Sequence, residues 1–163
     1  MIRTCHNKKG FGLVEVVIAA GIISAVIGAL IATTNTFFKS SRSTTSDVKA
    51  GYLLEEGVEA LKVMRDGGYT ANISSLSNNT SYYFSWNGTT WTANTSTTSI
   101  DSVFYRTVKL GAAYRDGNSD LANSGTLDAN TRKATVTVTW FDPGKKATST
   151  KTLVTYISNI FGN

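Results

Sequence analysis

The chain has 163 residues, a formal net charge of +5, one cysteine and one histidine. Cys5, His6 and three of the 16 basic side chains lie within the first ten residues, and the remaining 13 basic against 11 acidic side chains leave only +2. This small, scattered charge is not typical of a nucleic-acid-binding protein. From residue 11 onward, the lack of cysteine and histidine excludes disulfides, thiol and histidine catalysis, and the usual zinc and copper sites.

An apolar run dominates the amino-terminal part of the chain. From Phe11 to Ala32 the sequence reads FGLVEVVIAAGIISAVIGALIA, and only Glu15 and Ser24 are polar. As a helix this run is about 33 Å long, enough to cross the hydrocarbon core of a bilayer. The run is longer than the apolar core of a secretory signal peptide, which is followed by a small-residue cleavage site. A lipoprotein signal would need an apolar run before Cys5, and the chain has none there. The sequence therefore predicts a helix that stays in the membrane.

Glu15 is the unusual residue of this run. A carboxylate inside hydrocarbon costs about 2.5–3.5 kcal/mol on insertion scales, so a charged residue there is a functional hypothesis in its own right. The alternative is that Glu15 lies close enough to the lipid headgroups to be hydrated.

The residues around Glu15 resemble the class III signal of type IV prepilins and pseudopilins. The matching pattern is Lys8-Lys9-Gly10 followed by FGLVEVVIAAGII, with the glutamate at the fifth position counted from Phe11. The resemblance implies cleavage between Gly10 and Phe11 by a prepilin peptidase on the cytoplasmic side, and N-methylation of the new Phe11 amine. It also implies that Glu15 attracts the amino-terminal cation of a neighbouring subunit, which would offset much of the cost of the charge in a low dielectric.

Small residues recur along one face of the apolar helix, at Gly21, Ala25 and Gly28. Such a stripe permits close helix–helix approach, although glycine and alanine are also common in membrane helices in general. In a filament whose core is a bundle of these helices, the stripe would be the packing surface. The partners implied by the resemblance are other pilin or pseudopilin subunits, an inner-membrane assembly platform, and the lipid bilayer before assembly.

Helical periodicity returns after a polar stretch, KSSRSTTSD, of mediocre helix propensity. Leu54, Val58 and Leu61 recur at i, i+4 and i+7, and Gly67-Gly68 marks the end of the helix. A single helix from Phe11 to Met64 would be about 80 Å long. The expected division is a cleaved leader at 1–10, a transmembrane or filament-core helix at 11–33, an amphipathic helix at 34–66, and a β-sheet head at 67–163.

The head has the signals of an antiparallel sheet. YYFSW and TTWT are joined by Asn87-Gly88, the favoured pair for a type I′ turn. SVFYRTVKLGAAY predicts a strand through about Leu110. KATVTVTWF alternates apolar and polar residues, and Asp142-Pro143-Gly144 then turns the chain into TSTKTLVTYIS. This ending is loosely similar to minor pilins and small pseudopilins.

Two features differ from many major pilins. The only proline is Pro143, so the apolar helix lacks the proline that many type IV pilins carry there. The chain also cannot close the carboxy-terminal disulfide loop of many major pilins. Both features argue against a major pilin of a retractile pilus, and they leave the export and assembly signal unchanged.

Two further candidate sites come from loops and aromatic residues. Asp116, Asn118 and Asp120 occupy alternate positions, as the first three ligands of a calcium-binding loop do. The same residue types are also common in ordinary turns. Calcium is therefore a possible cofactor of the head. The second candidate is a group of aromatic residues, which could form a binding surface for glycan or nucleic acid. We expect it mainly to form the core of a hairpin. Its members are Tyr82, Tyr83, Phe84, Trp86 and Trp91.

The sequence predicts an α+β fold, with a long amino-terminal helix packed on an antiparallel sheet as in pilins. The expected function is a structural subunit of a type IV pilus-like or type II secretion-type filament. The subunit would lie first in the bacterial cytoplasmic membrane with its amino terminus in the cytoplasm, and later in an extracytoplasmic filament. The alternative is a membrane-anchored extracytoplasmic binding module that does not polymerise. No nucleophile–base pair is visible, so we do not expect an enzyme.

Overall fold

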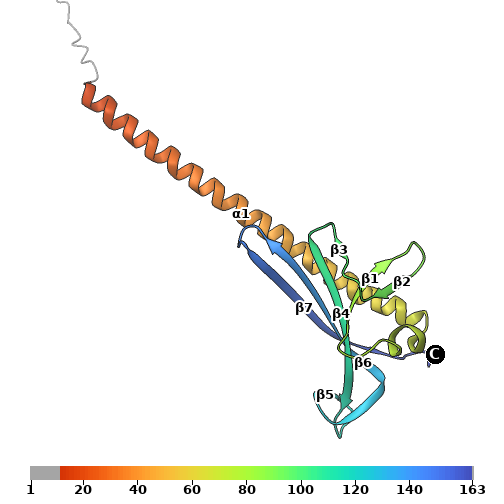
Figure 1. The fold of residues 1–163 in the computed structure, drawn as a ribbon. Coiled ribbons are helices and arrows are strands. Elements are labelled where there is room, and N and C mark those ends of the chain that lie inside the picture. Colours follow the sequence, from red (N-terminus) through yellow and green to blue (C-terminus); the bar gives the residue numbers. More distant parts are fainter. Residues whose placement is uncertain (1–11, 163) are drawn as a thin grey trace, which may run out of the picture. The chain divides into compact units, whose positions relative to one another are not determined.

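The computed structural model describes residues 12–162, which form one long helix and a seven-stranded sheet (Figure 1). Helix α1 is followed by a π-helical turn, η1, and strands β1 to β7. The chain divides into two compact units, Met1–Ser41 and Arg42–Asn163. The elements are α1 (Leu13–Asp66), η1 (Thr70–Ser74), β1 (Ser81–Trp86), β2 (Trp91–Asn94), β3 (Ser99–Ile100), β4 (Phe104–Arg115), β5 (Leu121–Ala122), β6 (Thr126–Asp142) and β7 (Ala147–Ser158).

In the first unit, the described residues belong to the apolar half of α1. Every residue from 12 to 41 is exposed, including large apolar side chains such as Leu13 at 82% and Leu30 at 61%. The Ser24 hydroxyl donates to the Ala20 carbonyl at 2.8 Å. A helix that satisfies its own backbone and hydroxyl groups can enter hydrocarbon. By length and composition, α1 is the one helix within residues 12–162 that could cross a membrane.

In the second unit, α1 buries one stripe of small and apolar residues against the sheet. The predicted stripe is confirmed at Leu54 and Leu61, whereas Val58 is only half-buried. The stripe follows the i, i+3, i+4 spacing of an amphipathic helix. The polar stretch KSSRSTTSD is helical as well, despite its weak propensity. The buried residues of α1 are Ala50, Leu53, Leu54, Gly57, Ala60, Leu61 and Met64.

The sheet is antiparallel, with the strand order β2-β1-β4-β6-β7, and β3 and β5 pair with β4. In Figure 1, β4, β6 and β7 run beside the second half of α1. The predicted alternation in β6 is confirmed: Val136, Val138 and Trp140 are buried in the core, and the intervening threonines are half-buried on the other face. The predicted α+β, pilin-like architecture is therefore correct.

The predicted hairpin between β1 and β2 exists, but the predicted two-residue turn is wrong. Trp86 pairs with Trp91, so the connection has four residues. A type I′ turn needs a positive φ at both central residues, and of the predicted pair only Gly88 has one, at +97°. Instead, the Asn87 side-chain carbonyl accepts hydrogen bonds from the Thr89 and Thr90 N–H groups at 3.0 and 2.8 Å. The asparagine therefore stabilises a longer loop with its side chain.

The two central strands are longer than the sequence predicts. β4 continues past Leu110 to Arg115, and β6 already begins at Thr126. Their register shifts between Ala112 and Ala113, as at a β-bulge. Short alanine and glycine side chains give a weak local strand signal, so cross-strand pairing decides the extension. The turn predicted at Asp142-Pro143-Gly144 is confirmed, because β6 and β7 pair up to Asp142 and Ala147.

Replacing each of two glycines of α1 by alanine should change the free energy of unfolding in opposite directions. At Gly57 a Cβ would lie 2.8 Å from Val136 Cγ1 and 3.1 Å from Arg106 Cδ, whereas at Gly51 it would meet nothing within 4 Å. We expect Gly57→Ala to lower the free energy of unfolding by about 1–3 kcal/mol through overpacking. Gly51→Ala should raise it by up to about 1 kcal/mol through helix propensity. Urea unfolding of both variants measures the difference, and a stabilising Gly57→Ala would contradict the close packing.

Acid should destabilise the contact between α1 and the β6–β7 turn. The Asp142 side chain is fully buried and accepts hydrogen bonds from the Ser43 hydroxyl at 2.6 Å and the Gly144 N–H at 2.8 Å, and the Lys145 ammonium lies 3.4 Å away. These contacts, the Ser43 bond most of all, lower the pKa of Asp142, although burial alone would raise it. Because the folded pKa lies below the unfolded value of about 3.9, this stabilisation is complete above that value. It is lost as the pH falls through the folded pKa.

The measurement is the Tm of the wild type and of Asp142→Asn from pH 6 down to pH 2. We expect the wild type to lose more stability over this range than Asp142→Asn, which lacks the titrating group. Glu55→Gln, at an exposed position of α1, is the control and should keep the wild-type profile. Equal profiles for the wild type and Asp142→Asn would refute the assignment.

Candidate processing and assembly site

Glu15 lies in the first turn of α1 and points back toward the start of the helix. The Gly12 N–H donates to Glu15 Oε2 at 3.1 Å, and the Glu15 N–H donates to the Gly12 carbonyl at 3.0 Å. This is one half of a capping box, with Gly12 as the N-cap and Glu15 as the third helical residue, because Gly12 has no side chain to accept the Glu15 N–H in return. The negative charge also lies at the positive end of the helix dipole. The carboxylate is thus held at the amino-terminal end of the apolar helix.

Glu15 carries the only charge of the apolar stretch of α1, because no other side chain between Leu13 and Phe38 is charged. A single backbone N–H stabilises a carboxylate but does not neutralise its charge, so transfer of this end of the helix into an apolar environment remains costly. A cation placed beside Glu15 would remove much of that cost.

The predicted stripe of small residues lies on the exposed apolar half of α1. Gly21, Ala25 and Gly28 are all exposed, and a Cβ at Gly21 or at Gly28 would meet nothing within 4 Å. The surface is therefore open to a neighbouring helix. Its use in assembly stays a prediction, as do the proposed segment boundaries. Gly10 and Phe11, the predicted processing residues, lie outside the described residues.

The loop predicted to bind calcium is held by its own hydrogen bonds. Asp116 Oδ1 accepts the N–H groups of Asn118 and Asp120 at 2.8 and 3.0 Å. Arg115 donates to the Ser119 carbonyl and forms an ion pair with Asp128, both at 2.7 Å. Bonds from the Thr131 side chain and then from Arg115 lower the pKa of Asp128.

Within residues 12–162, no group of three His, Cys, Asp or Glu side chains is arranged to hold a metal ion. That search leaves out the Asn118 amide. Calcium at Asp116, Asn118 and Asp120 therefore stays a prediction.

The aromatic group divides between the core and the surface. Tyr82 and Phe84 are buried in the core, as expected for a hairpin packed on α1. Trp86 is 52% exposed, and its ring centroid lies 5.8 Å from that of Trp91. Trp91 is half-buried and packs against the core. The prediction of a hairpin core is therefore correct for one face of β1.

The sequence interpretation missed Arg106, a buried cation in the head. Its side chain donates to the Leu53 carbonyl at 3.2 Å, pairs with Glu56 at 3.1 Å, and lies 5.4 Å from the ring centroid of Trp91. The period-two pattern of β4 could have predicted the burial of this arginine. Phe104, Arg106 and Val108 share the buried face, so the alternation places an arginine in the core.

The comparison with protein families matches the amino-terminal segment only. A family model described as the prokaryotic N-terminal methylation motif matches residues 5–31. No curated protein and no solved structure matches the chain. The matched segment contains the predicted processing residues, Glu15 and the small-residue stripe. The chain therefore carries the prepilin signal of type IV pilins, at residues 5–31, on an α+β pilin-like fold.

Proposed function

We propose that the protein is a type IV pilin-like structural subunit that a prepilin peptidase cleaves after Gly10 and that then enters a filament through α1. The observation that carries the proposal is one acidic residue, Glu15, in the first turn of an exposed apolar helix that bears the methylation motif. In this scheme the helix lies in the cytoplasmic membrane before assembly, with its amino terminus in the cytoplasm. The head then lies on the extracytoplasmic side.

The electrostatics of Glu15 support assembly through a neighbour's amino terminus. Cleavage after Gly10 would leave the Phe11 amine as the new terminus, and N-methylation keeps its positive charge. A neighbour's ammonium beside Glu15 would add the opposite charge that the Gly12 N–H cannot supply. Assembly would thereby replace a costly single charge in lipid by a pair.

Two features of many major pilins that this sequence lacks support a minor pilin or a pseudopilin. The only proline is Pro143, and after residue 11 the chain has no cysteine. Many major pilins have a proline in the apolar helix and a disulfide in the head. We therefore place the protein among minor pilins or pseudopilins. Its partners would be other subunits, the prepilin peptidase and the membrane assembly platform.

The second candidate is a membrane-anchored binding module that does not polymerise. The exposed apolar half of α1 would suffice as its anchor. This candidate assigns no role to the charge of Glu15, so variants at that position distinguish the two functions.

The mature amino terminus tests the processing step. We expect intact mass spectrometry of the protein from its native host to give a chain that begins at methylated Phe11, because the signal ends at Gly10. As a matched control, Gly10→Val should retain residues 1–10, since a branched side chain replaces glycine at the cleavage position. A wild-type chain that keeps its first ten residues, or is cut near Thr34 instead, would refute the proposal.

A further inference from the structure

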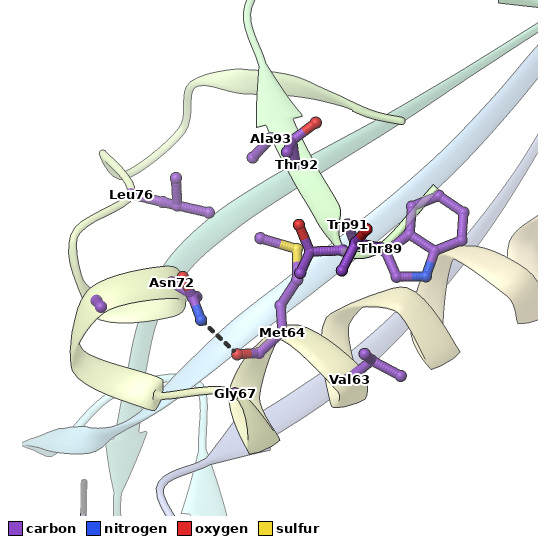
Figure 2. A pocket seen from close by; sticks show the side chains of 11 residues that line it. Val63, Met64, Gly67, Asn72, Leu76, Thr89, Trp91, Thr92 and Ala93 are labelled. Carbon is purple, nitrogen blue, oxygen red and sulfur yellow. Dashed lines mark hydrogen bonds between the residues drawn. The ribbon is translucent and has the colours of Figure 1, made fainter. Parts of the chain in front are cut away.

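A hollow of about 480 Å³ lies in the head where three segments of the second unit meet (Figure 2). These segments are the carboxy-terminal end of α1, η1 with the loop after it, and β2 with the loop before it. Small-molecule pockets typically have volumes of about 300–1,000 Å³. The lining residues are Val63, Met64, Gly67, Ala71, Asn72, Leu76, Thr89, Thr90, Trp91, Thr92 and Ala93.

The floor of the hollow is apolar and firmly held. Met64 is 7% exposed and belongs to the core, and Leu76, Trp91 and Ala93 pack against that core. In Figure 2 the Met64 side chain rises between Asn72 and Leu76 on one side and β2 on the other. The Arg106 guanidinium lies over the Trp91 ring, 5.4 Å from its centroid, and this contact helps to orient the indole. A floor fixed in this way needs little ordering when a ligand binds.

The rim of the hollow is polar but uncharged. Thr89 and Thr90 supply hydroxyl groups and Asn72 supplies an amide, whereas the Thr92 hydroxyl donates to the Ser85 carbonyl. The Asn72 NH₂ group donates to the Met64 carbonyl at 3.0 Å, which orients the amide. A side-chain amide has a carbonyl oxygen in addition to its NH₂ group, so Asn72 retains acceptor capacity for a ligand. None of the eleven lining residues, all within the described part of the chain, carries a charge.

This combination selects the chemical class of the ligand. A phosphate or carboxylate would find no cation in the lining, and nucleic acid needs a basic surface. A purely apolar side chain from a partner protein would cover the hydroxyl groups without pairing them, which costs free energy. A sugar ring has both an apolar C–H face and hydroxyl groups. We propose that the hollow binds a neutral saccharide, with the ring on Met64 and Trp91 and its hydroxyl groups on Asn72, Thr89 and Thr90.

The test is a titration of the full-length chain in micelles of a detergent without a sugar headgroup. Galactose and N-acetylglucosamine are the neutral probes, and glucosamine and N-acetylneuraminic acid are the charged probes. Calorimetry and tryptophan fluorescence measure binding, and near-ultraviolet circular dichroism checks the fold. We expect millimolar binding of at least one neutral sugar, and at least about tenfold weaker binding of the charged probes, equal to about 1.4 kcal/mol.

Three variants locate the site. Ala71→Phe fills the hollow from the exposed surface of η1 and should weaken binding at least tenfold. Thr89→Val removes a rim hydroxyl group at nearly constant volume and should weaken binding by a smaller factor. Thr95→Phe, in the exposed loop after β2 and outside the lining, is the matched control and should bind like the wild type.

Two results would overturn the proposal. One is a wild-type chain that binds neither neutral sugar, or that binds a charged probe more tightly. The other is a folded Ala71→Phe variant that binds like the wild type. Because this site does not depend on Glu15 or on cleavage, its failure would leave the proposed filament function intact, and the reverse also holds.

Discussion

Glu15→Gln should abolish filament assembly although it preserves the start of α1. Glutamine at the third helical position can still accept the Gly12 N–H that Glu15 Oε2 accepts at 3.1 Å. What it removes is the charge. A pair of unit charges 4 Å apart is worth about 4 kcal/mol at an effective dielectric of 20, equal to roughly a thousandfold in an equilibrium constant. We expect the filament fraction sheared from cells to fall at least a hundredfold, while processing and membrane insertion persist.

Companion variants separate the charge from the cap. Glu15→Ala removes both and should fail like Glu15→Gln, whereas Glu15→Asp keeps a charge and should retain part of the assembly. Ser24→Ala, which changes the other polar side chain of the apolar run, should assemble normally because that hydroxyl bonds its own helix. Immunoblots of sheared filaments and mass spectra of the cell-bound subunit give the two readouts. If Glu15→Gln assembles like the wild type, the pairing mechanism is wrong and the anchored binding module is favoured.

Arg106→Ala should be among the most destabilising single changes in the head. The arginine is 3% exposed, and its loss removes a hydrogen bond to Leu53, an ion pair with Glu56 and the contact with Trp91. It also leaves a cavity between α1 and the sheet. We expect the free energy of unfolding to fall by about 2–4 kcal/mol, measured by urea unfolding. Arg106→Met fills most of this volume without a charge and should recover more than half of the loss.

The ion pair itself should contribute little. The Glu56 side chain is 47% exposed, so water and salt screen its charge. Glu56→Gln should therefore cost less than about 1 kcal/mol. If Glu56→Gln costs as much as Arg106→Ala, the charge pair rather than the buried packing of the arginine stabilises this part of the head.

Local patterns explain why parts of the fold could be predicted. The apolar run, the single glutamate and the basic residues before it are consecutive, so the membrane helix and the processing signal can be read without tertiary information. The period-two pattern of β6 likewise places Val136 and Val138 in the core. The buried stripe of α1 at Leu54 and Leu61 likewise follows from the helical spacing of apolar residues in one segment. Each of these patterns reflects which side of one element avoids water.

The wrong predictions have different causes: the Asn87 side chain stabilises a longer loop by local hydrogen bonds, whereas pairing with a distant segment decides where β4 ends. β4 passes Leu110 because β6 pairs with it.

The prepilin-type signal around Gly10 and Glu15, the apolar helix and the alternating strands could be predicted from the amino-acid sequence, since these features depend on neighbours along the chain. The partners of the buried Arg106, the capping contact of Glu15 and the hollow beside Met64 emerged only in three dimensions. The hollow and the arginine depend on segments brought together by folding, and the cap depends on a side-chain direction that residue spacing leaves open.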